Sequence, residues 1–238
     1  MIQAIKNSFA AFSKDPVTFM VPTFLYPMLM LITLGAICGV LLIVFFIFTL
    51  LGLTGTTSMY VLGGVGVLLG LVYMIMAAGY KGAMVNEYNN ATEKGVVGLE
   101  HYLKYAFANA GRLFVIAFIK MALIGFVLMP FVLLYYYVLY EYHEAYTVLA
   151  ALAALAGVFI IEFVFAFSYP AYVVRKVSPI TAIIISFNFV KDKHIKALGI
   201  YAFYSVVALS TLIPLLDIIT YFVFYPIAYT SLLLFFKR

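Results

Sequence analysis

The stretch Ser178-Pro-Ile-Thr-Ala-Ile-Ile-Ile-Ser-Phe-Asn-Phe-Val-Lys-Asp-Lys-His-Ile-Lys196 decides how the chain is interpreted, because it separates two long apolar runs. Ser178 suits a helix N-cap and Pro179 the first helical position, which predicts a short helix with a partly apolar face. The start of the chain has the same arrangement, a short amphipathic segment in front of a long apolar run. The chain is therefore predicted to be built from such pairs.

Composition indicates an integral helical membrane protein. Of the 238 residues, 67% are hydrophobic and 10% are charged, whereas soluble domains carry about 25% charged residues. The mean hydropathy is +1.15. The net charge of +5 comes from basic residues scattered through short loops, which argues against nucleic acid as a partner. The single cysteine, Cys38, lies in an apolar run, so no disulfide within the chain is predicted.

Six transmembrane helices are predicted from apolar runs of about 20 residues or more. They lie near residues 17–47, 57–85, 111–140, 146–174, 195–213 and 216–236. Together they form a single all-α transmembrane domain over residues 1–238. In the second span, Gly66 and Gly70 form a small-xxx-small pair, which predicts the close approach of another helix.

Three shorter segments, residues 2–14, 99–110 and 179–192, are predicted to be amphipathic helices at the cytoplasmic membrane surface. Large apolar residues share one side of the first segment: Ile2, Ile5, Phe9 and Phe12. The polar N-terminus lacks the apolar core of a signal peptide, so it is expected to stay on the protein. Thirteen of the fourteen Lys and Arg residues precede odd spans or follow even ones. This bias predicts a plasma-membrane protein with both termini in the cytoplasm.

An internal repeat is predicted from the match between the third amphipathic segment and the first. Residues 178 positions apart are identical at four places: Ala4 and Ala182, Ile5 and Ile183, Ser8 and Ser186, Phe9 and Phe187. A fainter middle copy places Ala106 and Phe107 opposite Ala11 and Phe12, 95 residues apart. Residues 2–85, 98–174 and 179–236 would then be parallel repeats around an axis along the membrane normal. The alternative is that biased composition alone makes such segments alike.

Several motifs resemble a known group of proteins. They are Ala-Ile-x-x-Ser-Phe, an aromatic with Lys-Asp-Pro before a long span, and Tyr-Pro…Ser-Pro-Ile-x-Ala-Ile before the fifth span. They resemble an uncharacterised family of prokaryotic six-span membrane proteins, which is similar to the membrane domain of some glycerophosphodiester phosphodiesterases. The resemblance covers most of the chain and implies a fold rather than an activity. Those enzymes carry their chemistry in a separate soluble domain, for which this chain has no room.

No enzyme active site, cofactor or metal site is predicted. The three histidines, His101, His143 and His194, are too dispersed to suggest a metal cluster or a base–nucleophile pair. Glu162 is the strongest single clue. It follows Tyr146 by 16 residues and precedes Arg175 by 13, about 24 and 20 Å of helix. An ionisable group so close to the bilayer centre is costly and suggests function.

Lys120 and Glu162 form the candidate intramembrane polar site. If the third and fourth spans form a hairpin, the two residues differ in depth by about 6 Å, which a lysine side chain can cover. Pairing would keep both groups charged with little net gain in stability. Otherwise Lys120 would extend to the headgroups, and a protonated Glu162 would face a polar cavity.

Two functions remain open from the sequence. The favoured one is transport or permeation of an ion or small solute, with Glu162 as the binding or coupling group. The other is a non-enzymatic membrane-organising or partner-binding subunit, whose amphipathic helices contact anionic lipid at the cytoplasmic face. The lipid bilayer is the expected partner in both, and a second copy of the chain or another membrane protein is left open.

Overall fold

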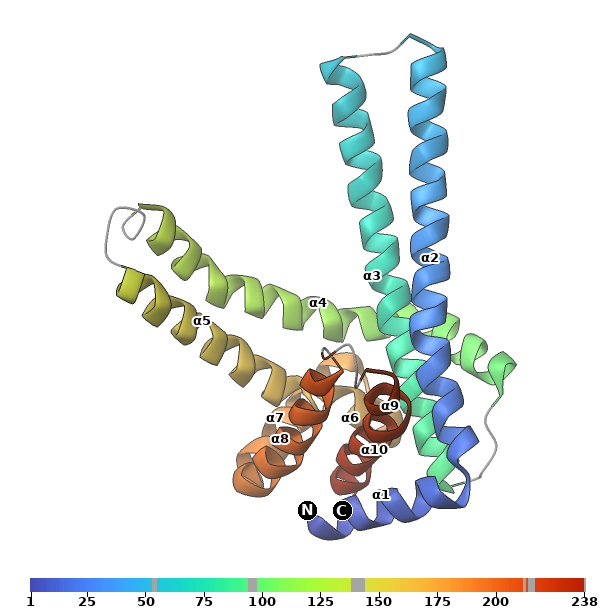
Figure 1. Cartoon of the computed structure of the whole chain (residues 1–238), viewed down its shortest axis with the longest axis vertical. Helices are drawn as coiled ribbons and strands as arrows, with labels where there is room; N and C mark the ends of the chain where they lie inside the picture. The colour runs from blue at the N-terminus through green and yellow to red at the C-terminus, as the bar shows by residue number, and fades with distance from the viewer. Residues whose placement is uncertain (53–54, 94–97, 138–143, 212, 214–216, 238) are drawn as a thin grey trace. The chain divides into compact units, whose positions relative to one another are not determined.

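The computed structural model describes residues 1–52, 55–93, 98–137, 144–211, 213 and 217–237, and all regular structure in these ranges is helical (Figure 1). The elements are α1 (Ile2–Lys14), α2 (Pro16–Leu50), α3 (Thr56–Glu93), α4 (Leu99–Tyr137), α5 (Glu144–Phe165), α6 (Ser168–Arg175), α7 (Pro179–Asp192), α8 (His194–Ser210), α9 (Asp217–Ile219), the π-helix η2 (Thr220–Phe224) and α10 (Tyr225–Phe236).

Five helical stretches in the described residues are long and apolar enough to cross a membrane. They are Pro16–Leu50, Ser58–Glu93, Leu99–Leu134, Tyr146–Arg175 and Asp217–Phe236. The protein is therefore a multi-pass helical membrane protein. The predicted fifth span corresponds to α8, which has 17 residues. That is about 26 Å of helix, less than the roughly 30 Å of a bilayer core, so α8 is not among the five.

The described contacts divide the chain into two compact units. Unit 1 comprises Met1–Lys14 with Val115–Arg238, and unit 2 comprises Asp15–Phe114. In unit 2, α2 and α3 run side by side as an antiparallel pair (Figure 1). Asp15 caps α2 by accepting a hydrogen bond from the backbone N–H of Thr18, with Pro16 at the first helical position, as such positions favour.

The core of unit 2 lies at the C-terminal end of α3. Tyr88 is fully buried, and its hydroxyl lies 2.6 Å from the hydroxyl of Thr23 on α2. Helix α3 is also joined to α4, because the hydroxyl of Tyr102, near the start of α4, donates to the carbonyl of Tyr80 at 2.7 Å. The start of α2, the end of α3 and the start of α4 therefore hold one another through buried tyrosines.

Close helix approach in unit 2 occurs at Gly79 rather than at the predicted glycine pair. A Cβ built on Gly79 would lie 2.7 Å from the carbonyl oxygen of Ala106. Gly82 is similarly close to the side chain of Leu113. A Cβ on Gly66 or on Gly70 would meet no described atom within 4 Å. Among the described residues, the predicted close approach is therefore not found at Gly66 and Gly70, and helices approach closely further along α3, at Gly79 and Gly82.

Unit 1 is built around the ends of the last helices. Helix α1 packs against α10, where the hydroxyls of Ser8 and Ser231 form a buried hydrogen bond. Helix α7 packs against α5 and α6, where the hydroxyl of Ser186 donates to the carbonyl of Val164.

Ser178 caps α7 as predicted, by accepting a hydrogen bond from the backbone N–H of Thr181. The ring of Phe167 packs with aromatic rings of α7 and α10: Phe189, Phe235 and Phe236.

The first and third of the predicted amphipathic segments form helices with the predicted bounds, but the second is not a separate helix. Residues 99–110 continue without a break into α4. The reason is local, because the start of α2 combines the capping Asp15 with Pro16, whereas Gly111-Arg-Leu-Phe114 contains neither proline nor a capping side chain.

Proline interrupts the fourth and sixth predicted spans. The fourth divides into α5 and α6 on the N-terminal side of Pro170, and the last contains η2 directly before Tyr225 and Pro226. Proline has no N–H for the carbonyl four residues earlier. In the last span the backbone hydrogen bonds change from the α-helical spacing of four residues to the π-helical spacing of five, so the N–H of Tyr225 donates to the carbonyl of Thr220. Both interruptions fall where the helices enter the core of unit 1.

Candidate functional site

The two residues of the predicted polar site meet in unit 1. Lys120 lies on α4 and Glu162 on α5, and the lysine Nζ donates to the glutamate Oε1 at 2.8 Å. The side chain of Lys120 is 20% exposed and that of Glu162 is 40% exposed within the chain itself. Of the two arrangements considered from the sequence, the structure has the ion pair.

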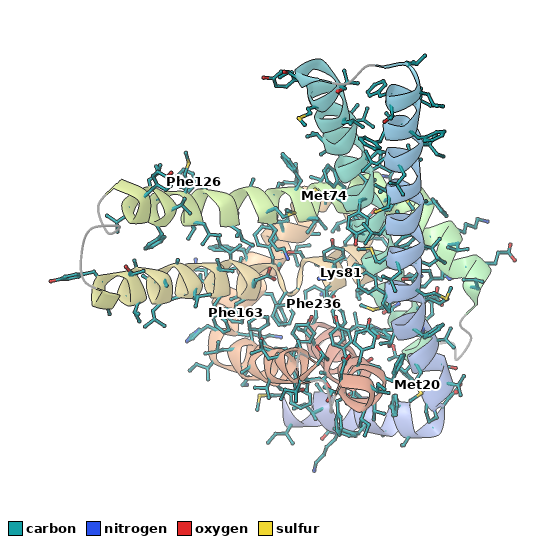
Figure 2. The ribbon with its side chains drawn as sticks, turned by 45° about the horizontal axis from the view of Figure 1, so that its top comes forward. Met20, Met74, Lys81, Phe126, Phe163 and Phe236 are labelled. Carbon is teal, nitrogen blue, oxygen red and sulfur yellow. The ribbon has the colours of Figure 1, made fainter. Side chains whose placement is uncertain are left out.

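Aromatic side chains border this pair on the α8 side. The ring of Tyr201 lies 5.4 Å from that of Phe159 and 5.2 Å from that of Phe163 (labelled in Figure 2), measured between centroids. These phenylalanines lie three residues before Glu162 and one after it. The residues on either side of Glu162 in α5 therefore pack against a tyrosine of α8.

Tyr201 belongs to a cluster that joins α8 to the last helix. We define the tyrosine cluster as Tyr201, Tyr204, Tyr225 and Tyr229. The hydroxyls of Tyr204 and Tyr225 lie 3.3 Å apart, and the rings of Tyr204 and Tyr229 meet edge to face at 5.5 Å. Tyr225 follows η2 directly, and short π-helical turns occur frequently at functional sites. Sequence analysis did not identify this cluster, because its members are spread over two helices.

The predicted depth of Glu162 depended on one continuous helix from Tyr146 to Arg175. The structure retains the first part, since Tyr146 and Glu162 both lie on α5. The second part is wrong, because α5 ends at Phe165 and the chain turns before α6. The distance of about 24 Å from the Tyr146 end of the helix therefore stands, whereas the matching distance to Arg175 does not.

A second acidic residue was missed by the sequence analysis. Glu87 on α3 is fully buried in unit 2, and its Oε1 is hydrogen-bonded to the Nδ1 of His101 on α4. Asn86 and Asn90 flank the carboxylate, yet its Oε2 has no hydrogen-bond partner among the described residues. Buried carboxylates normally have partners for both oxygens, so this atom marks an incompletely satisfied site.

Glu87 was missed because the predicted second span ends at residue 85, whereas α3 continues to Glu93. The run Asn86-Glu87-Tyr88-Asn89-Asn90 at the end of an apolar helix was the available signal. His101 was not predicted to belong to a site, and its side chain is more than half exposed.

Of the other two histidines, only His194 lies in the described part of the chain, and it is not part of either site. His194 contacts the backbone carbonyl of Lys191 at 3.3 Å, and His143 lies outside the described residues. In the described part of the chain, no three His, Cys, Asp or Glu side chains are grouped closely enough to hold a metal ion.

Comparison of the chain with protein-family models, with curated proteins and with solved structures finds no match. The resemblance to prokaryotic six-span proteins stays a prediction that depends on the motifs quoted above. The function is therefore argued from the geometry of the sites.

Proposed function

We propose that this protein transports an ion or a small solute across the membrane, with Glu162 as the group that binds it. The observation that carries the proposal is an ion pair within two apolar helices, one of which packs against a tyrosine cluster. Apolar side chains would stabilise a helical hairpin at least as well as a buried ion pair. Ionisable residues within membrane helices generally mark ion or substrate pathways.

The pair provides a two-state element for such a pathway. In the paired state, Lys120 compensates the charge of Glu162, so neither charge is left alone in the membrane. A proton or a cationic solute that binds Glu162 compensates the negative charge in place of Lys120, and the lysine is then released from the pair. The hydroxyls of Tyr204 and Tyr225, 3.3 Å apart, would offer further hydrogen-bond donors and acceptors along such a pathway.

The second candidate function is membrane organisation without transport. It is favoured by the complete pairing of Lys120 with Glu162 at 2.8 Å, which also suits a permanent link between α4 and α5. In that case the amphipathic helices would carry the function through contacts with anionic lipid. The two candidates differ in whether Glu162 must exchange its partner.

Flux measurements on proteoliposomes distinguish the candidates. We expect the purified chain to mediate flux driven by a pH gradient, and Glu162→Gln to reduce that flux about tenfold or more, because the amide can neither release a proton nor bind a cation by charge. Glu100→Gln is the matched control, since Glu100 is an exposed acid in the first turn of α4. Equal flux through the Glu162→Gln variant and the parent would overturn the role of Glu162. No flux through the parent would favour membrane organisation.

We also propose that α8 completes a sixth crossing and that the three repeats are related by rotation about the membrane normal, with both termini cytoplasmic. Ala4 and Ser8 are fully buried, as are Ala182 and Ser186 at the matching positions. In the middle copy, burial favours a different register from the one predicted. Ala106 is fully buried, whereas Ala11, its predicted counterpart 95 residues earlier, is not. Ser8, which lies 98 residues before Ala106, is fully buried and is therefore the better counterpart.

A further inference from the structure

The three amphipathic segments bury and expose the same positions. In α1, at the start of α4 and in α7, buried residues recur every four residues: Ala4 and Ser8; Tyr102, Ala106 and Ala110; Ala182, Ser186 and Val190. The residue after the second member of each series is an exposed phenylalanine. Phe9 is 43% exposed, Phe107 60% and Phe187 53%. A periodic pattern that recurs in three places is more specific than one exposed side chain.

Each segment buries an alanine or a serine against another helix. In unit 1, Ser8 meets Ser231 of α10, and Ser186 meets the backbone of α5 at Val164. In unit 2, the backbone of Ala106 lies against Gly79. Alanine and serine at such positions let two helices approach closely. The large apolar residues are thereby left on another side.

This other side forms an apolar stripe with basic residues near it. On α1 the stripe contains Ile2 and Phe9, and on α7 it contains Ile180, Ile184 and Phe187. Residues spaced by four and by seven positions lie on one face of a helix. Exposed lysines occur on the same two helices: Lys6 and Lys14 on α1, and Lys191 on α7. The combination of bulky apolar residues with lysine is typical of helices at a lipid interface.

The geometry points to one occupant for these stripes, and we propose that α1 and α7 insert them into the headgroup–acyl boundary of the membrane that the chain itself crosses, where their lysines contact anionic phosphates. Only Asp15 separates α1 from α2, and only Lys193 separates α7 from α8. Val17 is 66% exposed, so the apolar surface of the first span begins almost directly after α1. A lipid surface is therefore next to the stripe by chain connectivity. The inference holds whether or not the protein transports a solute.

Tryptophan fluorescence tests this placement directly, because the chain has no tryptophan. The full-length variants Phe9→Trp and Phe187→Trp are reconstituted in vesicles of phosphatidylcholine and phosphatidylglycerol with brominated acyl chains. The matched control is Asn7→Trp, at an exposed position of α1 away from the stripe. We expect bromine to quench the stripe positions at least about twofold more than the control, and aqueous iodide to show the opposite order. Equal bromine quenching at stripe and control positions would overturn the proposal.

Two further measurements distinguish lipid from other occupants. Quenching by brominated phosphatidylglycerol should exceed quenching by brominated phosphatidylcholine at Phe9→Trp, and the added changes Lys6→Gln and Lys14→Gln should remove this preference. A tryptophan shielded from both bromine and iodide would show that protein covers the stripe, which would contradict a lipid contact. Because both stripe positions are exposed, the variants should keep the helical circular dichroism of the parent.

Discussion

Glu162 in unit 1 and Glu87 in unit 2 each lie on the second helix of an apolar hairpin, but the chain surrounds them differently. Glu162 has a full counter-charge in Lys120 and keeps 40% of its side chain exposed. Glu87 is completely buried, has a half-exposed histidine as partner and leaves one oxygen without a hydrogen bond. The acid that stands out in the sequence is therefore the better satisfied one. An isolated charge in an apolar run indicates a costly position, whereas the actual cost depends on the partners that folding supplies.

The difference has a local cause in each hairpin. Helix α3 continues to Glu93, so its polar end lies against the first turns of α4 and Glu87 enters the core. Helix α5 ends three residues after Glu162, where the chain turns before α6. We therefore expect Glu87 to matter mainly for stability and Glu162 mainly for function.

The largest effect on stability is expected from His101→Ala. This change removes the hydrogen bond that α4 donates to Glu87, whose carboxylate stays buried. The unfolding free energy should therefore fall by about 2–3 kcal/mol. Denaturant unfolding in detergent measures it, and adding Glu87→Gln should recover part of the loss, because a neutral amide is cheaper to bury. His194→Ala is the matched control, since His194 is exposed. Equal losses in the two histidine variants would show that Glu87 does not depend on His101.

An intermediate effect is expected from Gly79→Ala, which tests the close packing that buries Glu87. The new methyl group would meet the backbone oxygen of Ala106, which cannot move aside as a side chain can, so a loss of about 1–3 kcal/mol is expected. Gly66→Ala on the same helix meets open space and should be neutral or slightly stabilising, because alanine favours helices. If both variants unfold alike, α3 and α4 are not in close contact there.

The smallest effect is expected from the pair in unit 1. Lys120→Met and Glu162→Gln should each lower stability in detergent by about 1 kcal/mol, and the double variant should be partly recovered, because polar pairs between membrane helices contribute little. A double-mutant cycle gives the coupling energy. Purely additive losses would mean that the pair contributes nothing, and Glu162 would then be a protonatable group on a polar pathway, with Lys120 as an anchor at the headgroups.

The sequence by itself determined the membrane class, the two short helices at 2–14 and 179–192, and the cap at Ser178. It also indicated that Lys120 and Glu162 could meet, because counting residues along two antiparallel helices gives their relative depth. These features depend on hydropathy, on helix-terminating residues and on chain length, all of which are local. A capping serine or a proline acts on its own turn, whatever the rest of the chain does.

Only the tertiary structure decided which side of each amphipathic helix is buried. The sequence favoured the large residues of α1 as its defining face, yet Ala4 and Ser8 are buried and Phe9 is not. The partners of these small residues come from distant parts of the chain: Ser231 lies 223 residues after Ser8. The tyrosine cluster escaped prediction because its members lie on two different helices. Periodicity shows which residues share a face, but whether that face meets a helix or lipid depends on packing across the whole sequence.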